Sequence, residues 1–173
     1  ALRRATLVAV TRKAVPREEA EAWLDRLGAH APGVPRLLLH LRPDALRRWG
    51  APDAEPVSGL AGERVLAVSG IGDPRAFAAQ LRAAGAEVDE AAHGDHHAFD
   101  AGDAERLAAR AAAADRVVCT LKDAVKLGPL WPRGAPALWY VSQRVVVERG
   151  ARVLADSLDR LLAARDAGAR APG

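Results

Sequence analysis

The chain has 173 residues, half of them apolar, and so has the length and composition of a large globular domain with a buried core. Its net charge of +3 comes from basic and acidic residues interspersed along the chain, which argues against nucleic acid as a partner. The lone cysteine excludes an intramolecular disulfide framework and fits the cytoplasm, and no run approaches the roughly 20 apolar residues of a membrane-spanning helix. Because methionine is absent, the initiator included, we expect a processed or truncated chain.

The first 50 residues predict a strand, a helix and a second strand. An apolar run rich in β-forming residues covers residues 5–10, and a second covers residues 37–41. Between them, apolar residues recur at helical spacing after Pro16, and Gly28 ends the pattern. Gly, Pro, Asp and Ser are then frequent, which predicts a linker over residues 51–62.

Beyond the linker, strand and helix patterns alternate. Strands are predicted at residues 64–68, from Ala86, and at residues 116–119, where Cys119 would be buried. Two helices separate these strands, and Asp73 and Asp100 precede them as N-cap residues. Because this alternation favours parallel strands with helical crossovers, we predict an α/β fold with a mainly parallel, Rossmann-like sheet flanked by helices.

The C-terminal part ends in two further strands and a helix. Residues 137–141 and 144–148 predict strands that could pair as an antiparallel hairpin, although the two residues between them make a poor hairpin turn. An amphipathic helix is predicted from Val153 to Leu162. The predicted division is a strand–helix–strand unit at 1–50, a linker at 51–62, an α/β lobe at 63–165 and a disordered tail at 166–173.

The first candidate site is the loop between a predicted strand and helix at Gly70-Ile71-Gly72. Its backbone N–H groups could bind a phosphate, although a tight turn without a ligand also explains the glycines. The dinucleotide fingerprint is incomplete, because Arg75 stands where its third glycine would be. No Gly-x-x-x-x-Gly-Lys-Ser/Thr phosphate loop is present, so we expect the chain alone to lack an ATP site.

The second candidate segment is Thr120–Leu127. Thr120 and Asp123 have the spacing of a helix cap, which gives them a structural explanation. That explanation does not cover Lys122, a cation in the first turn, where the helix dipole disfavours it. Lys122 and Lys126 lie one helical turn apart and could bind a phosphate together.

The third candidate is Asp95-His96-His97. An imidazole exchanges protons near neutral pH, and an adjacent carboxylate can fix its tautomer, so the motif suits acid–base chemistry. With His93 the segment could also bind a metal, but no second cluster of ligands completes a coordination shell, so we predict none. A loop without a catalytic role is the remaining interpretation.

The candidate segments occur together in one known family. Residues 68–77, 81–86, 95–99 and 120–127 resemble, in order and approximate spacing, the tetraacyldisaccharide 4'-kinases of lipid A synthesis. The resemblance covers the family's C-terminal portion and extends from the strand ending at Arg12 to the final helix. The chain departs from the family pattern at Leu121, where glutamate is usual, and before Asp95, where an aromatic–proline pair is usual.

This resemblance implies transfer of the ATP γ-phosphoryl group to the 4'-hydroxyl of tetraacyldisaccharide 1-phosphate, the lipid A precursor, with magnesium. It further implies a peripheral enzyme at the cytoplasmic face of the inner membrane. ATP and Mg²⁺ would be bound mainly by an N-terminal half missing here, of which residues 1–50 would be a remnant. His96 would support a catalytic base in that half, and Asp95 would orient His96. We therefore expect this chain alone to be inactive.

Two alternatives remain open at this point. The chain could be a non-enzymatic α/β module that binds an anion at Gly70, Gly72, Lys122 and Lys126. It could also be a metal-dependent phosphoesterase that uses Asp95-His96-His97, although the further aspartate motifs of such enzymes are missing.

Overall fold

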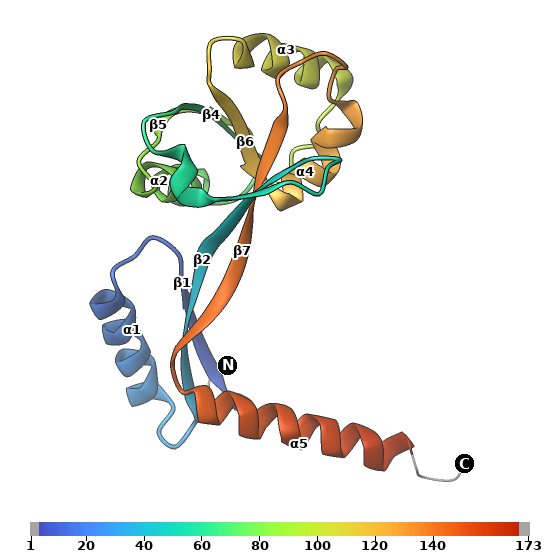
Figure 1. Cartoon of the computed structure of the whole chain (residues 1–173). Helices are drawn as coiled ribbons and strands as arrows, with labels where there is room; N and C mark the ends of the chain where they lie inside the picture. The colour runs from blue at the N-terminus through green and yellow to red at the C-terminus, as the bar shows by residue number, and fades with distance from the viewer. Residues whose placement is uncertain (1–3, 170–173) are drawn as a thin grey trace. The chain divides into compact units, whose positions relative to one another are not determined.

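The computed structural model describes residues 4–169 (Figure 1). Contacts between residues group the chain into two compact units. Unit 1 comprises residues 1–42 and 145–173, and unit 2 comprises residues 43–144. Two strands, β2 (Arg36–Arg48) and β7 (Leu138–Arg149), each contribute residues to both units, so this grouping divides the chain within them and not at residues 51–62.

Unit 1 contains the strand–helix–strand segment expected near the N-terminus. β1 (Val8–Arg12) pairs in parallel with the first part of β2, and α1 (Arg17–His30) connects them. Acidic residues in the first turn of α1 complement the helix dipole, and its inner face buries Leu24 against Leu38. The remaining helix of unit 1, α5 (Ala151–Ala169), continues into the segment predicted as a disordered tail, whose last residues, 170–173, lie outside the described part.

Unit 2 contains most of the sheet. Its strands are β3 (Ala54–Pro56), β4 (Arg64–Ser69), β5 (Glu87–Ala92), β6 (Arg116–Thr120) and the adjoining parts of β2 and β7. The order along the sheet is β2-β7-β6-β4-β5, with β3 on β2. β7, β6, β4 and β5 are parallel to one another, which confirms the predicted mainly parallel α/β fold.

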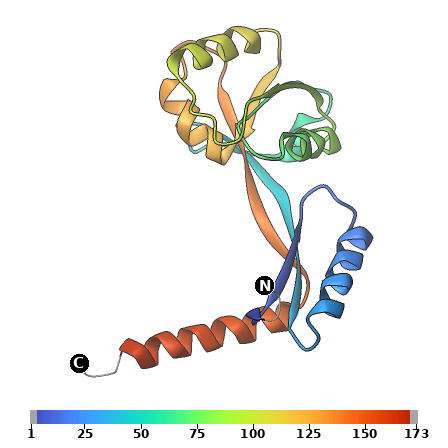
Figure 2. The same cartoon turned by 180° about the vertical axis from the view of Figure 1, so that it is seen from behind.

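Helices cover both faces of this part of the sheet (Figures 1 and 2). They are α2 (Pro74–Ala83), α3 (Ala101–Ala111), α4 (Leu121–Leu127) and the short 3-10 helix η3 (Gly128–Leu130). Alternate residues of β4 point to opposite faces: Val65 packs with α2 and Leu66 with α3 and α4. The predicted caps Asp73 and Asp100 each accept a hydrogen bond from a first-turn backbone N–H.

Cys119 of β6 is fully buried, as predicted, and burial raises the pKa of its thiol, so it is an inert core residue.

The predicted C-terminal hairpin was wrong. The two C-terminal strands are one continuous strand, β7, because the residues between them continue the extended backbone; the antiparallel partner of β7 is β2. Ser142 of β7 bonds the backbone N–H and carbonyl of Ala45 through its hydroxyl. The segment predicted as a linker contains β3 and the 3-10 helix η2 (Val57–Leu60), whose Leu60 is fully buried.

None of the helices in the described part of the chain combines the length and the apolar character needed to cross a membrane.

Candidate functional site

The three predicted site segments meet at one edge of the sheet of unit 2. The loop after β4 holds Gly70 and Gly72, the loop after β5 holds Asp95, His96 and His97, and α4 follows β6 directly. Because these strands are parallel, their carboxyl ends share an edge, which is where open α/β sheets bind ligands. The tertiary structure therefore unites segments that are separated by up to 53 residues in the sequence.

Asp123 is the fully buried centre of this edge. Its Oδ2 accepts hydrogen bonds from Thr120 Oγ1 at 2.7 Å and from the Gly70 N–H at 3.0 Å, while its own N–H donates to Thr120 Oγ1. The cap predicted for Thr120 and Asp123 is therefore present. The bond to Gly70 is an addition, and sequence reasoning missed it because the two residues are far apart along the chain.

The glycines of the first loop are closely packed. A Cβ atom on Gly70 would lie 3.3 Å from both Asp123 Oδ1 and His97 Cβ, and one on Gly72 would lie 3.3 Å from Asp95 Oδ2. The Gly70 N–H is already donated to Asp123, so this group is engaged within the protein. These contacts favour the tight-turn interpretation, and phosphate binding at Gly70 and Gly72 stays a prediction.

Asp95 and His96 form the exposed tip of the second loop. Asp95 Oδ1 accepts from the His96 N–H at 3.0 Å and from Lys122 Nζ at 3.4 Å, and Asp95 Oδ2 lies 3.8 Å from His96 Nε2. Partial removal from water opposes ionisation, but Lys122 and His96 together lower the pKa of Asp95. The His96 side chain is 80% exposed, so its ring is open to a group outside unit 2.

His97 has the opposite environment, although it is the next residue. Its Nε2 lies 2.8 Å from Asp103 Oδ2, and Asp103 also accepts from Arg106 and from the Asp100 N–H. The hydrogen bond from His97 is the main cause that lowers the pKa of Asp103 to about 2, against the effect of burial. Asp103 was missed as a site residue, although the spacing of Asp100 and Asp103 at the start of α3 is the signature of the capping box that holds it.

His93 completes a small aromatic cluster. Its ring centroid lies 4.6 Å from that of His97 and 5.0 Å from that of Phe99. Burial, and next the charge of His97, lower the pKa of His93, which favours its neutral form.

His93, His97 and Asp103 are the set of described side chains that could ligate a metal, with their candidate ligand atoms within 4.8 Å of one another. The two histidine rings are tilted at an interplanar angle of 30°, and Asp103 already accepts from Arg106. Packing and hydrogen bonding hold these three side chains together, and the absence of a bound metal at the histidine segment stays a prediction.

The two lysines of α4 have separate internal contacts. Lys126 Nζ donates to the His97 carbonyl at 2.9 Å, whereas Lys122 contacts Asp95. Lys126 thus fixes the backbone of the histidine loop, and Lys122 neutralises its carboxylate. Phosphate binding by the two lysines together stays a prediction.

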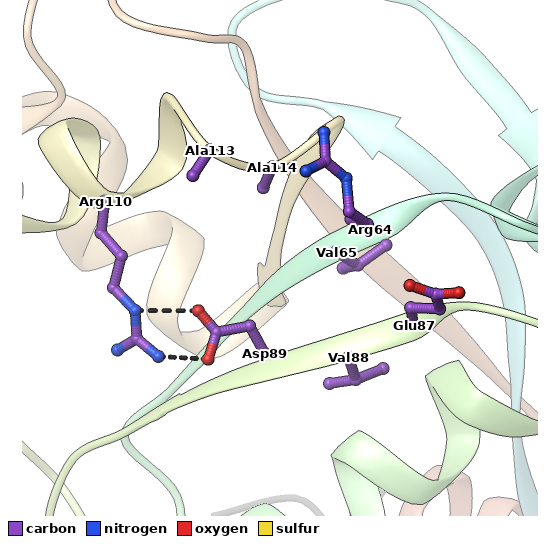
Figure 3. A pocket seen from close by; sticks show the side chains of 8 residues that line it. All are labelled: Arg64, Val65, Glu87, Val88, Asp89, Arg110, Ala113 and Ala114. Atoms are coloured by element: carbon purple, nitrogen blue, oxygen red, sulfur yellow. Dashed lines mark hydrogen bonds and ion pairs between the residues drawn. The ribbon is translucent and has the colours of Figure 1, made fainter.

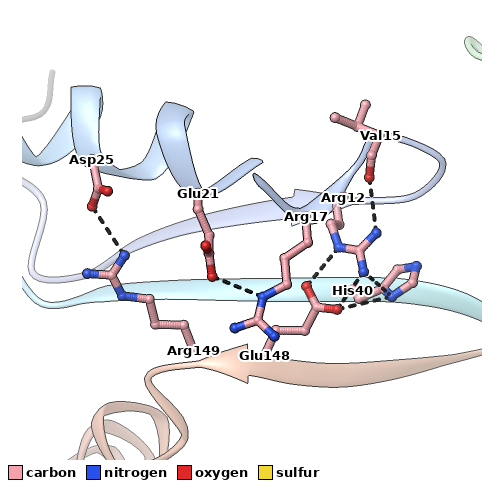
Figure 4. Close-up of polar contacts among 8 residues, drawn as sticks. All are labelled: Arg12, Val15, Arg17, Glu21, Asp25, His40, Glu148 and Arg149. Carbon is pink, nitrogen blue, oxygen red and sulfur yellow. Dashed lines mark hydrogen bonds and ion pairs between the residues drawn. The ribbon is translucent and has the colours of Figure 1, made fainter. Parts of the chain in front are cut away.

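Unit 1 carries a second polar cluster, which sequence reasoning missed (Figure 4). Arg12, at the end of β1, donates to both carboxylate oxygens of Glu148 at 2.7 and 2.6 Å, and its Nη2 lies 2.9 Å from His40 Nδ1. The hydrogen bond from Arg12 is the main cause that lowers the pKa of Glu148. No local pattern could reveal this cluster, because Arg12 and Glu148 are 136 positions apart.

Comparison with known proteins decides the family. The family model for tetraacyldisaccharide-1-P 4'-kinase (LpxK) matches residues 1–163. The chain belongs to this kinase family. Among curated relatives, the tetraacyldisaccharide 4'-kinase of Anaeromyxobacter sp. (strain K) is 41% identical over 170 residues, and that of Rhodopseudomonas palustris (strain BisB5) is 40% identical over 125 residues.

These matches cover most of this LpxK-family chain but less than half of each relative. The Anaeromyxobacter alignment spans 95% of this chain and 44% of the relative, and the Rhodopseudomonas alignment spans 69% and 36%. The crystal structure of LpxK from Aquifex aeolicus in complex with ATP has the same fold, with a TM-score of 0.52 over 88% of this chain and 41% of that one, at 21% identity.

Proposed function

We propose that the chain is the C-terminal part of a tetraacyldisaccharide 4'-kinase and that it supplies His96 to the reaction. The complete enzyme would transfer the ATP γ-phosphoryl group to the 4'-hydroxyl of tetraacyldisaccharide 1-phosphate, as a peripheral protein at the cytoplasmic face of the inner membrane. Family membership supports the reaction class. The observation that supports the site is His96, an exposed imidazole beside a carboxylate at the ligand-binding edge of a parallel sheet.

Each residue at the loop tip has a role in this proposal. His96 supports a base contributed by another part of the complete enzyme, either by accepting a proton from that base or by sharing one with it. Its ring can reach such a group because it faces outward. Asp95 orients His96 by accepting a hydrogen bond from its backbone N–H and by lying close to its ring. Lys122 holds Asp95 in place, at 3.4 Å.

In this proposal, ATP and Mg²⁺ are bound outside the site edge of unit 2. Asp123 Oδ2 accepts from Gly70 and Thr120, and Asp103 is paired with His97 and Arg106, so these oxygens are already engaged within the protein. We assign both ligands to the remaining part of the complete enzyme.

The deciding experiment is His96→Ala in the complete enzyme. We expect kcat to fall about a hundredfold, as for the loss of an acid–base partner, with little change in the KM for ATP. The matched control is His30→Ala, because His30 is an exposed histidine of α1 whose ring contacts the Arg26 carbonyl. A rate for His96→Ala equal to that of the control would remove His96 from the mechanism.

The chain alone is expected to have no kinase activity. It has no phosphate loop to hold the nucleotide, and phosphoryl transfer depends mainly on a positioned, charge-neutralised nucleotide. The assay is transfer of labelled phosphate from ATP to the lipid acceptor by the purified 173-residue chain. Labelled product above the level of a heat-denatured sample would contradict the proposal.

A further inference from the structure

The backbone of His96 is held in an unusual conformation. Its φ angle is +61°, in the left-handed region that residues other than glycine seldom adopt. A residue keeps such a conformation only when neighbouring contacts over-determine it. The groups that hold the His96 backbone therefore also decide where its ring points.

Those groups lead from His96 to Asp123 through one residue. The His96 N–H has two acceptors, Asp95 Oδ1 at 3.0 Å and the Gly70 carbonyl at 3.2 Å. Gly70 in turn donates its N–H to Asp123 Oδ2 at 3.0 Å. The two backbone groups of Gly70 thus join the exposed histidine to the buried carboxylate.

The cap of α4 does not need the whole of the Asp123 carboxylate. Thr120 contacts Oδ2 and the backbone N–H of Asp123, whereas Oδ1 is buried without a hydrogen-bond partner among the described residues. A solvent-exposed threonine–acid cap would avoid that desolvation cost. Burial of this carboxylate against Gly70 is therefore a feature of the site edge, beyond what helix capping requires.

We propose that Asp123 is a positioning residue for His96 and acts through the backbone of Gly70. This inference rests on the proposed function for its catalytic consequence, but its structural part does not. The position of Gly70 depends on a close fit, because a Cβ there would lie 3.3 Å from both Asp123 Oδ1 and His97 Cβ. A side chain at Gly70 requires its neighbours or this backbone to shift by a few tenths of an ångström, which weakens the contact with Asp123 and the bond from the His96 N–H to the Gly70 carbonyl.

Four variants separate this role from helix capping. Asp123→Ala removes the acceptor of Gly70, and Gly70→Ala displaces the donor while leaving the cap of α4 intact. Thr120→Val removes the capping hydroxyl but keeps the contact between Asp123 and Gly70. Asp123→Asn keeps an amide oxygen that can accept from the Gly70 N–H.

The first measurement is amide hydrogen exchange of Gly70 and His96 in the 173-residue chain. We expect protection at both amides to fall at least tenfold in Asp123→Ala and Gly70→Ala, and to stay within threefold of the wild type in Thr120→Val and Asp123→Asn. If Asp123→Ala does not fold, Gly70→Ala gives the same test. Unchanged His96 protection in the two disrupting variants, or equal loss in all four, overturns the proposal.

The second measurement is steady-state kinetics of the same variants in the complete enzyme. We expect Asp123→Ala and Gly70→Ala to lower kcat at least tenfold with the KM for ATP within twofold, and Asp123→Asn to restore most of kcat. Full activity of His96→Ala would refute the proposed function, whatever the exchange data show. Loss of activity in His96→Ala but not in Asp123→Ala would refute the positioning role alone.

Discussion

The two ends of the parallel strands in unit 2 use charge in different ways. At the amino ends, basic residues are paired: Arg116 with Glu55 and Glu63, and Arg64 with Asp115. At the carboxyl ends, Asp123 has an unpartnered buried oxygen and the His96 ring faces solvent. Charged residues are frequent at both ends, so their frequency does not identify a functional edge. What distinguishes the carboxyl edge is that its polar groups are held in place but not all paired.

The amino-end pocket shows the contrast directly (Figure 3). It has a volume of about 290 Å³ and is lined by residues that include Arg64, Glu87, Asp89 and Arg110. Arg110 reaches from α3 to bind both carboxylate oxygens of Asp89, and Arg64 is held by Asp115. With its arginines already neutralised by carboxylates, this pocket has the features of a stabilised surface and not of an anion site.

The largest effect on stability is expected from Asp103→Asn at the carboxyl edge. The native pKa of Asp103 is about 2, below its ordinary 3.8, so between pH 4 and pH 2 the unfolded chain binds a proton that the native chain does not. The charge of Asp103 therefore stabilises the fold above pH 4, and this contribution is lost as the pH falls towards 2. In the variant we expect a lower free energy of unfolding at pH 7. Below pH 4 we expect this free energy to fall less steeply with pH than in the wild type, by a slope equivalent to about one proton.

Urea unfolding at several pH values between 2 and 7 measures this change. Asp53→Asn is a suitable control. Within the described part of the chain, the ion pair found for Asp53 is an exposed one with Arg48 at 3.4 Å. If Asp103→Asn and the wild type lose stability with equal slopes below pH 4, the ion-pair account of Asp103 is wrong.

A smaller effect is expected from Arg116→Met at the amino ends. Arg116 is 16% exposed, binds two glutamates and lies over the Trp139 ring at 4.7 Å. Removing it leaves two carboxylates without their partner, so we expect the free energy of unfolding to fall by about 1–2 kcal/mol. In the complete enzyme kcat should change less than twofold, because the site lies at the other ends of the strands.

Arg110→Ala is the exposed counterpart of this change. Both side chains of its ion pair with Asp89 are exposed to solvent, so we expect the free energy of unfolding to fall by about 0.5 kcal/mol. Chemical denaturation of both variants tests the comparison. A tenfold fall in kcat for Arg116→Met with unchanged stability would show that the amino ends also serve the reaction.

Local patterns predicted the elements of unit 2 well because their signals are contained within a few residues. The caps Asp73, Asp100 and Thr120 each bond a backbone N–H three positions ahead, and the buried strand around Cys119 follows from its apolar run. Composition was less informative at residues 51–62. Proline and glycine there predicted a linker, and this segment contains a short strand and a 3-10 helix whose Leu60 is buried.

The candidate site was only partly predictable, because many of its contacts join residues that are far apart in the sequence. The sequence by itself determined which chemistry is available: the Asp95-His96-His97 motif, the cap of α4, and the family that these segments resemble. Only the tertiary structure decided how each group is used, since it pairs His97 with Asp103, leaves His96 exposed, and joins Gly70 to Asp123 across 53 positions. Hydrogen bonds and burial depend on distances between residues in space. The number of positions between two residues in the sequence determines such a distance only within a single helix or turn.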